Sequence, residues 1–133
     1  MTTSESKMEL RRLMLEAAET GLSINDIEPM GTRLGIDPRQ LVNELALAVA
    51  SGLNAMTLDF DFCNQVMNGL EGVVAQLAVD GETPEPALSI YLAFDAGEFK
   101  RSNDPIDVYP TEKYTRPMIE RILLEHHERR DGA

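Results

Sequence analysis

The stretch from Asp37 to Gly52 constrains the fold of this chain more than any other segment. Asp37 followed by Pro38 is a strong helix start, because aspartate accepts from the free amides of the first turn and proline lacks an amide hydrogen. A helix over 38–51 is then apolar around nearly its whole circumference, through Leu41, Val42, Leu45, Ala46, Leu47, Ala48 and Val49. Since such a helix is buried on most sides, we expect a central helix that ends at Gly52. Its apolar surface is buried either within the domain or at a dimer interface, and the sequence does not decide between a monomer and a dimer.

Two helices are predicted before this segment. Thr2 and Glu5 have the spacing of a capping box at the start of a helix over 4–20. Ser23 is a good N-cap for a shorter second helix that ends at Gly35. In both helices the apolar residues recur at spacings of three and four, as on one buried face: Leu10, Leu13, Met14, Ala17, Ile24, Ile27, Met30 and Leu34.

The next predicted helix begins at an aspartate, either Asp59 or Asp61, and ends at a turn over 80–81. Gly69 and Gly72 within it either permit close contact with another helix or lower helix propensity by about 1 kcal/mol each. Its apolar residues again have helical spacing: Cys63, Val66, Met67, Leu70, Val73, Val74 and Leu77.

The segment from Thr83 to Gly97 allows two structures. The apolar run over 87–94 suits a buried strand. However, Thr83 followed by Pro84 has the pattern of a helix start, and Gly97 that of a helix end. We favour the helix, because no other segment offers a convincing strand partner.

The C-terminal third begins with a long polar loop over 100–114, and loops of this length are often functional. Thr115 is the predicted N-cap of a final helix that runs to about Arg130. The sequence therefore predicts an all-α fold, a compact single-domain bundle of about six helices spanning residues 1–133.

Charge is distributed unevenly along the chain. No Lys, Arg or His occurs between Arg39 and Lys100, whereas the same stretch holds nine carboxylates. Basic and acidic side chains number 5 and 8 in residues 1–50, 1 and 8 in 51–100, and 6 and 7 in 101–133, for a net charge of −11. A negative block of this kind attracts basic proteins or cations and repels nucleic acid.

These carboxylates gather at helix ends and turns. In a helical hairpin over 61–97, the two ends of the hairpin lie together beside the 100–114 loop, whose tyrosines are of a residue type favoured at interfaces. Lys100 and Arg101 either contact a partner there or neutralise neighbouring carboxylates. The predicted partner-binding residues are Asp59, Asp61, Asp80, Glu82, Asp95, Glu98, Tyr109 and Tyr114.

The leading hypothesis is a small acidic module that binds a basic protein partner. Its most concrete form is an immunity- or antitoxin-like inhibitor that covers the cationic surface of a nuclease toxin after electrostatically steered association. The polar N-terminus does not resemble a signal peptide. The longest apolar run, 45–50, is far short of the roughly 20 residues of a membrane span. We therefore expect a cytoplasmic protein that is not membrane-bound and needs no cofactor.

An alternative is a helix-turn-helix DNA-binding regulator. Within the segment 22–53, residues 34–53 resemble the turn and second helix of a winged-helix module. This alternative predicts that Arg39, Gln40 and Asn43 lie exposed on one face. The apolar remainder of that helix and the net charge of −11 argue against it, because phosphate neutralisation dominates affinity for DNA.

Catalysis or metal binding is a third possibility, using Asp95, Glu98 and His127. The sequence holds no phosphate-binding loop, nucleophile elbow or calcium loop. Adjacent histidines on a helix point roughly 100° apart, so His126 and His127 do not readily share one metal ion. The sequence supports no enzyme class, and catalytic activity stays open. The only cysteine, Cys63, is interpreted as a core residue and not as a reactive thiol.

Overall fold

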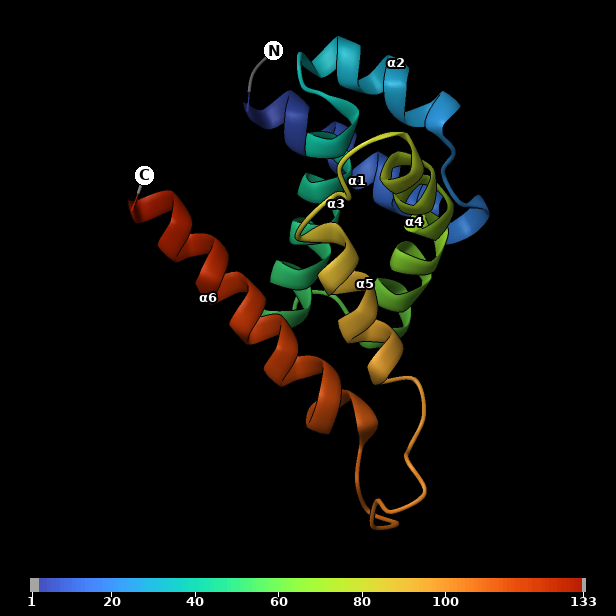
Figure 1. Cartoon of the computed structure of the whole chain (residues 1–133), viewed down its shortest axis with the longest axis vertical. Coiled ribbons are helices and arrows are strands. Elements are labelled where there is room, and N and C mark those ends of the chain that lie inside the picture. Colours follow the sequence, from blue (N-terminus) through green and yellow to red (C-terminus); the bar gives the residue numbers. More distant parts are fainter. Residues whose placement is uncertain (1–2, 133) are drawn as a thin grey trace.

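The computed structural model describes residues 3–132, and within them it contains six α-helices and no strand (Figure 1). The helices are α1 (Thr3–Thr20), α2 (Ile24–Leu34), α3 (Pro38–Asn54), α4 (Phe60–Asp80), α5 (Ala87–Ala96) and α6 (Arg116–Gly132). A short π-helical turn, η1 (Thr111–Thr115), leads directly into α6. The all-α prediction is therefore confirmed. None of these helices is long and apolar enough to cross a membrane.

Helix α3 is the centre of the bundle, as its apolar circumference predicts. It packs against α1, α2, α4, α5 and α6, and Figure 1 shows it running between α6 and the α4–α5 pair. Leu41, Val42 and Leu45 are completely buried. The chain itself covers this helix, so no dimer seam is needed to bury it.

Side-chain caps begin three helices where the sequence predicts them. The Asp37 carboxylate accepts from the Arg39 amide (2.7 Å), and the Asp59 carboxylate accepts from the Phe62 amide (2.8 Å). At the start of α2, the Asp26 carboxylate accepts from the Ser23 amide (2.8 Å). Asp59, and not Asp61, is therefore the cap of α4. The predicted capping box of Thr2 and Glu5 lies outside the described side chains.

Helix α3 continues through Gly52, so the predicted end at this glycine is wrong. A Cβ atom at Gly52 would lie 2.4 Å from Cδ1 of Leu58, which means that the glycine makes room for the returning chain. The Gly52 carbonyl accepts from the amides of Thr57 (2.9 Å) and Leu58 (3.1 Å). The chain reverses at Met56, whose φ of 63° is positive.

Helix α5 confirms the choice of helix over strand for 87–94, but its predicted start is wrong. The helix begins at Ala87, after the cis peptide bond between Glu85 and Pro86, and Thr83 does not cap it. Oδ1 of Asn43, on α3, accepts from the Ala87 amide at 3.0 Å. The cap thus comes from a distant helix, and no local pattern reveals it.

The predicted cap of the last helix is also wrong. Thr115 lies at the end of η1, inside a continuous helical run, and is completely buried. Its hydroxyl donates to the Ala93 carbonyl of α5 at 2.7 Å. Gly97 ends α5 as predicted, and a Cβ atom there would lie 2.0 Å from the Thr115 hydroxyl oxygen.

Candidate protein-binding surface

The structure brings the first and last groups of predicted carboxylates to one end of the bundle. Helices α4 and α5 run antiparallel, so the start of α4 meets the end of α5 (Figure 1). The rings of Phe60 and Phe94 lie 5.7 Å apart between centroids. The Asn64 amide donates to Oε1 of Glu98 at 3.0 Å. Asp59 and Asp61 therefore lie at the same end of the α4–α5 pair as Asp95 and Glu98, as the predicted helical hairpin requires.

Four carboxylates from α4, α5 and the turn after α5 form what we call the acidic face: Asp61, Glu71, Asp95 and Glu98. Asp61 and Glu71 share a side of α4 with Asn64, because residues three and seven positions apart align on a helix. Tyr91 of α5 lies among them, and its pKa is raised by partial burial and then by the charges of Glu71, Asp95 and Glu98. Burial and neighbouring negative charge both disfavour the charged phenolate and so act in the same direction.

The described ion pairs leave the acidic face uncompensated. They join Glu9 to Arg12 and Arg33, Asp104 to Lys113, and Glu112 to Arg116. None of them includes a carboxylate of the acidic face. Lys100 and Arg101 follow Glu98 closely in sequence, but Lys100 donates to the Ile106 carbonyl and the Arg101 guanidinium lies over the Tyr114 ring. No described ion pair therefore offsets the negative potential of the acidic face.

Asp80 and Glu82 do not join this face. Asp80 is the last residue of α4, at the opposite end of the helix from Asp59, and it accepts from the Gln76 amide at 3.1 Å. The carbonyl of Glu82 accepts from Nε of Arg39 at 2.7 Å. The two residues belong to the turn between α4 and α5, where Figure 1 shows the far end of the pair.

The 100–114 loop uses most of its charged and aromatic groups internally. The Tyr114 hydroxyl donates to the Asp104 carboxylate (2.6 Å to Oδ2), and Lys113 pairs with the same carboxylate. The Arg101 guanidinium carbon lies 3.9 Å from the centre of the Tyr114 ring. These contacts lower the pKa of Asp104, chiefly through Lys113 and then through Tyr114. Of the two predicted tyrosines, only Tyr109 is largely exposed, at 75%.

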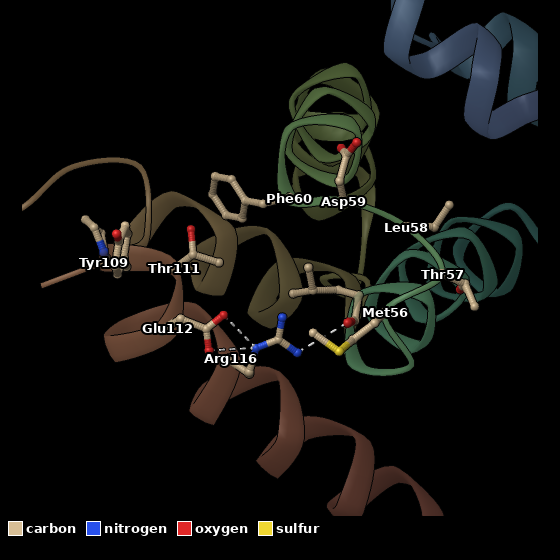
Figure 2. Close-up of a pocket in the computed structure, with 11 residues that line it drawn as sticks. Met56, Thr57, Leu58, Asp59, Phe60, Tyr109, Thr111, Glu112 and Arg116 are labelled. Carbon is tan, nitrogen blue, oxygen red and sulfur yellow. Dashed lines mark hydrogen bonds and ion pairs between the residues drawn. The ribbon is translucent and has the colours of Figure 1, made fainter.

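A groove of about 760 Å³ lies beside the acidic face, where the end of α3, the 55–59 loop and the start of the last helix meet (Figure 2). Met56 and Tyr109 stand exposed in its walls. Arg116 lies between Glu112 and the carbonyl of Leu53, to which its NH1 donates at 3.3 Å. The groove is lined by Leu53, Met56, Thr57, Leu58, Asp59, Phe60, Tyr109, Pro110, Thr111, Glu112 and Arg116.

The side chains of the predicted DNA-reading face are partly occupied within the fold. Arg39 donates to the carbonyls of Leu77 (2.9 Å) and Glu82 (2.7 Å), and Asn43 caps α5. Of the three expected residues, Gln40 is exposed, whereas Arg39 and Asn43 are partly buried. The DNA-binding alternative stays a prediction, and it loses the support of Arg39 and Asn43.

The remaining candidates for chemistry lie apart. Over the described residues, no three His, Cys, Asp or Glu side chains are grouped to hold a metal ion. His126 is half-buried on α6 and His127 is exposed. Cys63 is a core residue, as predicted: burial, and then the charge of Asp59, raise the pKa of its thiol to about 12.

Sequence reasoning missed Glu71, Tyr91 and the groove. Helical spacing from Asn64 is the signal that places Glu71 on the acidic face. The groove has no such signal, because its walls come from two segments far apart in the chain, 53–60 and 109–116. Comparison with known proteins adds no further guide: no family, curated protein or solved structure matches this chain.

Proposed function

We propose that this protein is a binding module that engages a basic protein partner through its acidic face. The observation that carries the proposal is the grouping of Asp61, Glu71, Asp95 and Glu98 on α4, α5 and the turn after α5. No described ion pair supplies these carboxylates with a compensating cation. A concentrated field of one sign accelerates association with a partner of the opposite sign and selects against like-charged surfaces.

The most concrete form of this function is an immunity- or antitoxin-like inhibitor of a nuclease toxin. A nuclease has to present cations to bind phosphate groups, and a face of fixed carboxylates competes for the same cations. The small all-helical scaffold and the net charge of −11 support this form of the proposal.

A pair of matched double variants tests the role of the acidic face. The immobilised full chain is used to isolate basic partners, and association of the purified partner is then measured at low and high salt. Asp95→Asn with Glu98→Gln removes two charges from the face and preserves side-chain shape. We expect the association rate to fall about tenfold at low salt. At high salt, the difference between the variant and the native chain should become small.

The control is Asp80→Asn with Glu82→Gln, which removes the same charge from the far end of the helix pair. We expect it to slow association much less. Equal effects of the two double variants would mean that net charge alone acts. A dissociation constant that salt leaves unchanged would contradict the electrostatic proposal.

A further inference from the structure

The groove beside the acidic face combines a large concavity with two uncommon backbone features. Met56 has a positive φ of 63°, which is rare for a residue with a side chain, and its side chain is 79% exposed at the rim. The opposite wall is η1, a π-helical turn, and such turns occur frequently at functional sites. Backbone strain held at a cavity is a recurrent property of ligand-binding segments.

The charges that line this groove leave an excess of one negative charge. Arg116 is engaged by Glu112, with Nε 3.0 Å from Oε2, and by the carbonyl of Leu53. Asp59 uses Oδ1 to cap the Phe62 amide and is exposed. Its carboxylate is therefore the group in the groove without an ion-pair partner among the described residues.

Apolar and aromatic side chains line the groove that contains the Asp59 carboxylate. Met56 and Tyr109 are exposed, Phe60 is half-buried, and all three line the groove (Figure 2). A guanidinium group pairs with a carboxylate and also stacks on an aromatic ring, while its aliphatic stem covers apolar surface. An ammonium group on a lysine is a compact, strongly hydrated charge and matches this lining less well.

We propose that the groove receives an arginine side chain, flanked by apolar residues, from an extended segment of the basic partner. The arginine stem packs between Met56 and Tyr109, and its guanidinium meets the Asp59 carboxylate. This proposal rests on the proposed function, since it names the feature of the basic partner that the groove recognises.

A short peptide tests the groove without the partner. The probe is acetyl-Gly-Leu-Arg-Leu-Gly-amide, titrated into the full chain labelled with ¹³C at the methionine methyl groups. We expect the Met56 methyl and the Tyr109 ring resonances to shift with saturation. The matched probe replaces arginine by citrulline, which keeps the shape and removes the charge. It should bind about fivefold more weakly, at the upper end for loss of an exposed ion pair.

Two identical substitutions at helix N-caps locate the charge that is recognised. Asp59→Asn keeps a good N-cap residue for α4 and removes the charge, and we expect peptide affinity to fall roughly fivefold. Asp37→Asn makes the same change at the start of α3, outside the groove lining, and should leave affinity within about twofold. Urea unfolding of both variants verifies that the caps are retained.

Three results would overturn the groove proposal: no shift at Met56, equal binding of the citrulline peptide, or equal losses from Asp59→Asn and Asp37→Asn. The first excludes the site, the second makes it an apolar pocket, and the third assigns binding to net charge. Each of them leaves the proposed function intact, because that function depends on Asp95 and Glu98 in the partner assay.

Discussion

The hydroxyl of Thr115 donates a 2.7 Å hydrogen bond to the carbonyl of Ala93 and so joins the start of the last helix to the end of α5. Ala93 lies in the last turn of α5, where carbonyls lack donors from their own helix. Gly97 lies against the same hydroxyl, since a Cβ atom there would be 2.0 Å from it. This contact holds the long 100–114 loop at its two ends and fixes the position of the groove wall.

Thr115→Val tests this contact, because it replaces the buried hydroxyl with a methyl group of similar shape. It leaves the Ala93 carbonyl without its donor, and we expect a loss of about 1–3 kcal/mol in the free energy of unfolding. Urea unfolding followed by circular dichroism measures it. Thr115→Ser retains the donor and should lose less. A Val variant as stable as the native chain would show that the hydrogen bond contributes nothing.

Gly69 and Gly72 provide a matched pair on α4. A Cβ atom at Gly69 would lie 2.0 Å from the Ala17 carbonyl oxygen of α1, whereas nothing lies within 4 Å of one at Gly72. We expect Gly69→Ala to destabilise the fold by about 1–3 kcal/mol through overpacking. Gly72→Ala should stabilise it by up to about 1 kcal/mol through helix propensity. Thermal and urea unfolding of both variants measure the difference. Equal effects would mean that α1 and α4 do not approach this closely.

Arg39 acts as a cap for the end of α4. Its guanidinium donates to the carbonyl of Leu77, in the last turn of that helix, at 2.9 Å and to the carbonyl of Glu82 at 2.7 Å. We expect Arg39→Ala to lower the free energy of unfolding by about 1–2 kcal/mol. Gln40→Ala, at the exposed neighbouring position, is the control and should change it by less than about 0.5 kcal/mol. Equal stability of the two variants would show that the Arg39 hydrogen bonds do not stabilise the end of α4.

Local patterns predicted most of the helices, because each carries its own information. Apolar spacing and the caps at Ser23, Asp37 and Asp59 are properties of neighbouring residues. The wrong boundaries share a cause, which is contact between distant residues. Gly52 stays helical because Leu58 returns over it, and α5 begins where Asn43 reaches it.

The candidate site also has features that local patterns predict and features that depend on contacts between distant residues. Helix pairing was predictable, so the meeting of Asp59 and Asp61 with Asp95 and Glu98 followed from sequence. The internal use of Tyr114 was not, because a sequence does not reveal which carboxylate its hydroxyl will reach. Asp80 and Glu82 belong to the same stretch without Lys, Arg or His, but they lie at the other end of the helix pair.

Acidification should loosen the 100–114 loop. Lys113 and Tyr114 hold the pKa of Asp104 below its usual range, so the ionised carboxylate stabilises the folded loop. A depressed pKa gives stability that is fully present above the unfolded value of about 3.9 and is lost progressively as the pH falls from there through the lowered folded value. The ring resonances of Tyr114, followed by NMR between neutral and acidic pH, measure this transition. Asp104→Asn should remove the pH dependence, and a transition that persists in this variant would assign it to another group.

Cys63 should be inert to thiol reagents in the folded protein. Its side chain is completely buried, its sulfur lies 3.7 Å from the Val49 carbonyl oxygen, and its pKa of about 12 keeps the thiolate scarce at neutral pH. The thiolate is the reactive form, so modification requires opening of the α3–α4 contact. We expect an aromatic disulfide reagent at pH 8 to react slowly with the native chain and completely within minutes in urea. The same reaction in Gly69→Ala, whose packing of α1 on α4 is disturbed, should be faster. Rapid modification of the native chain would contradict the assignment of Cys63 to the core.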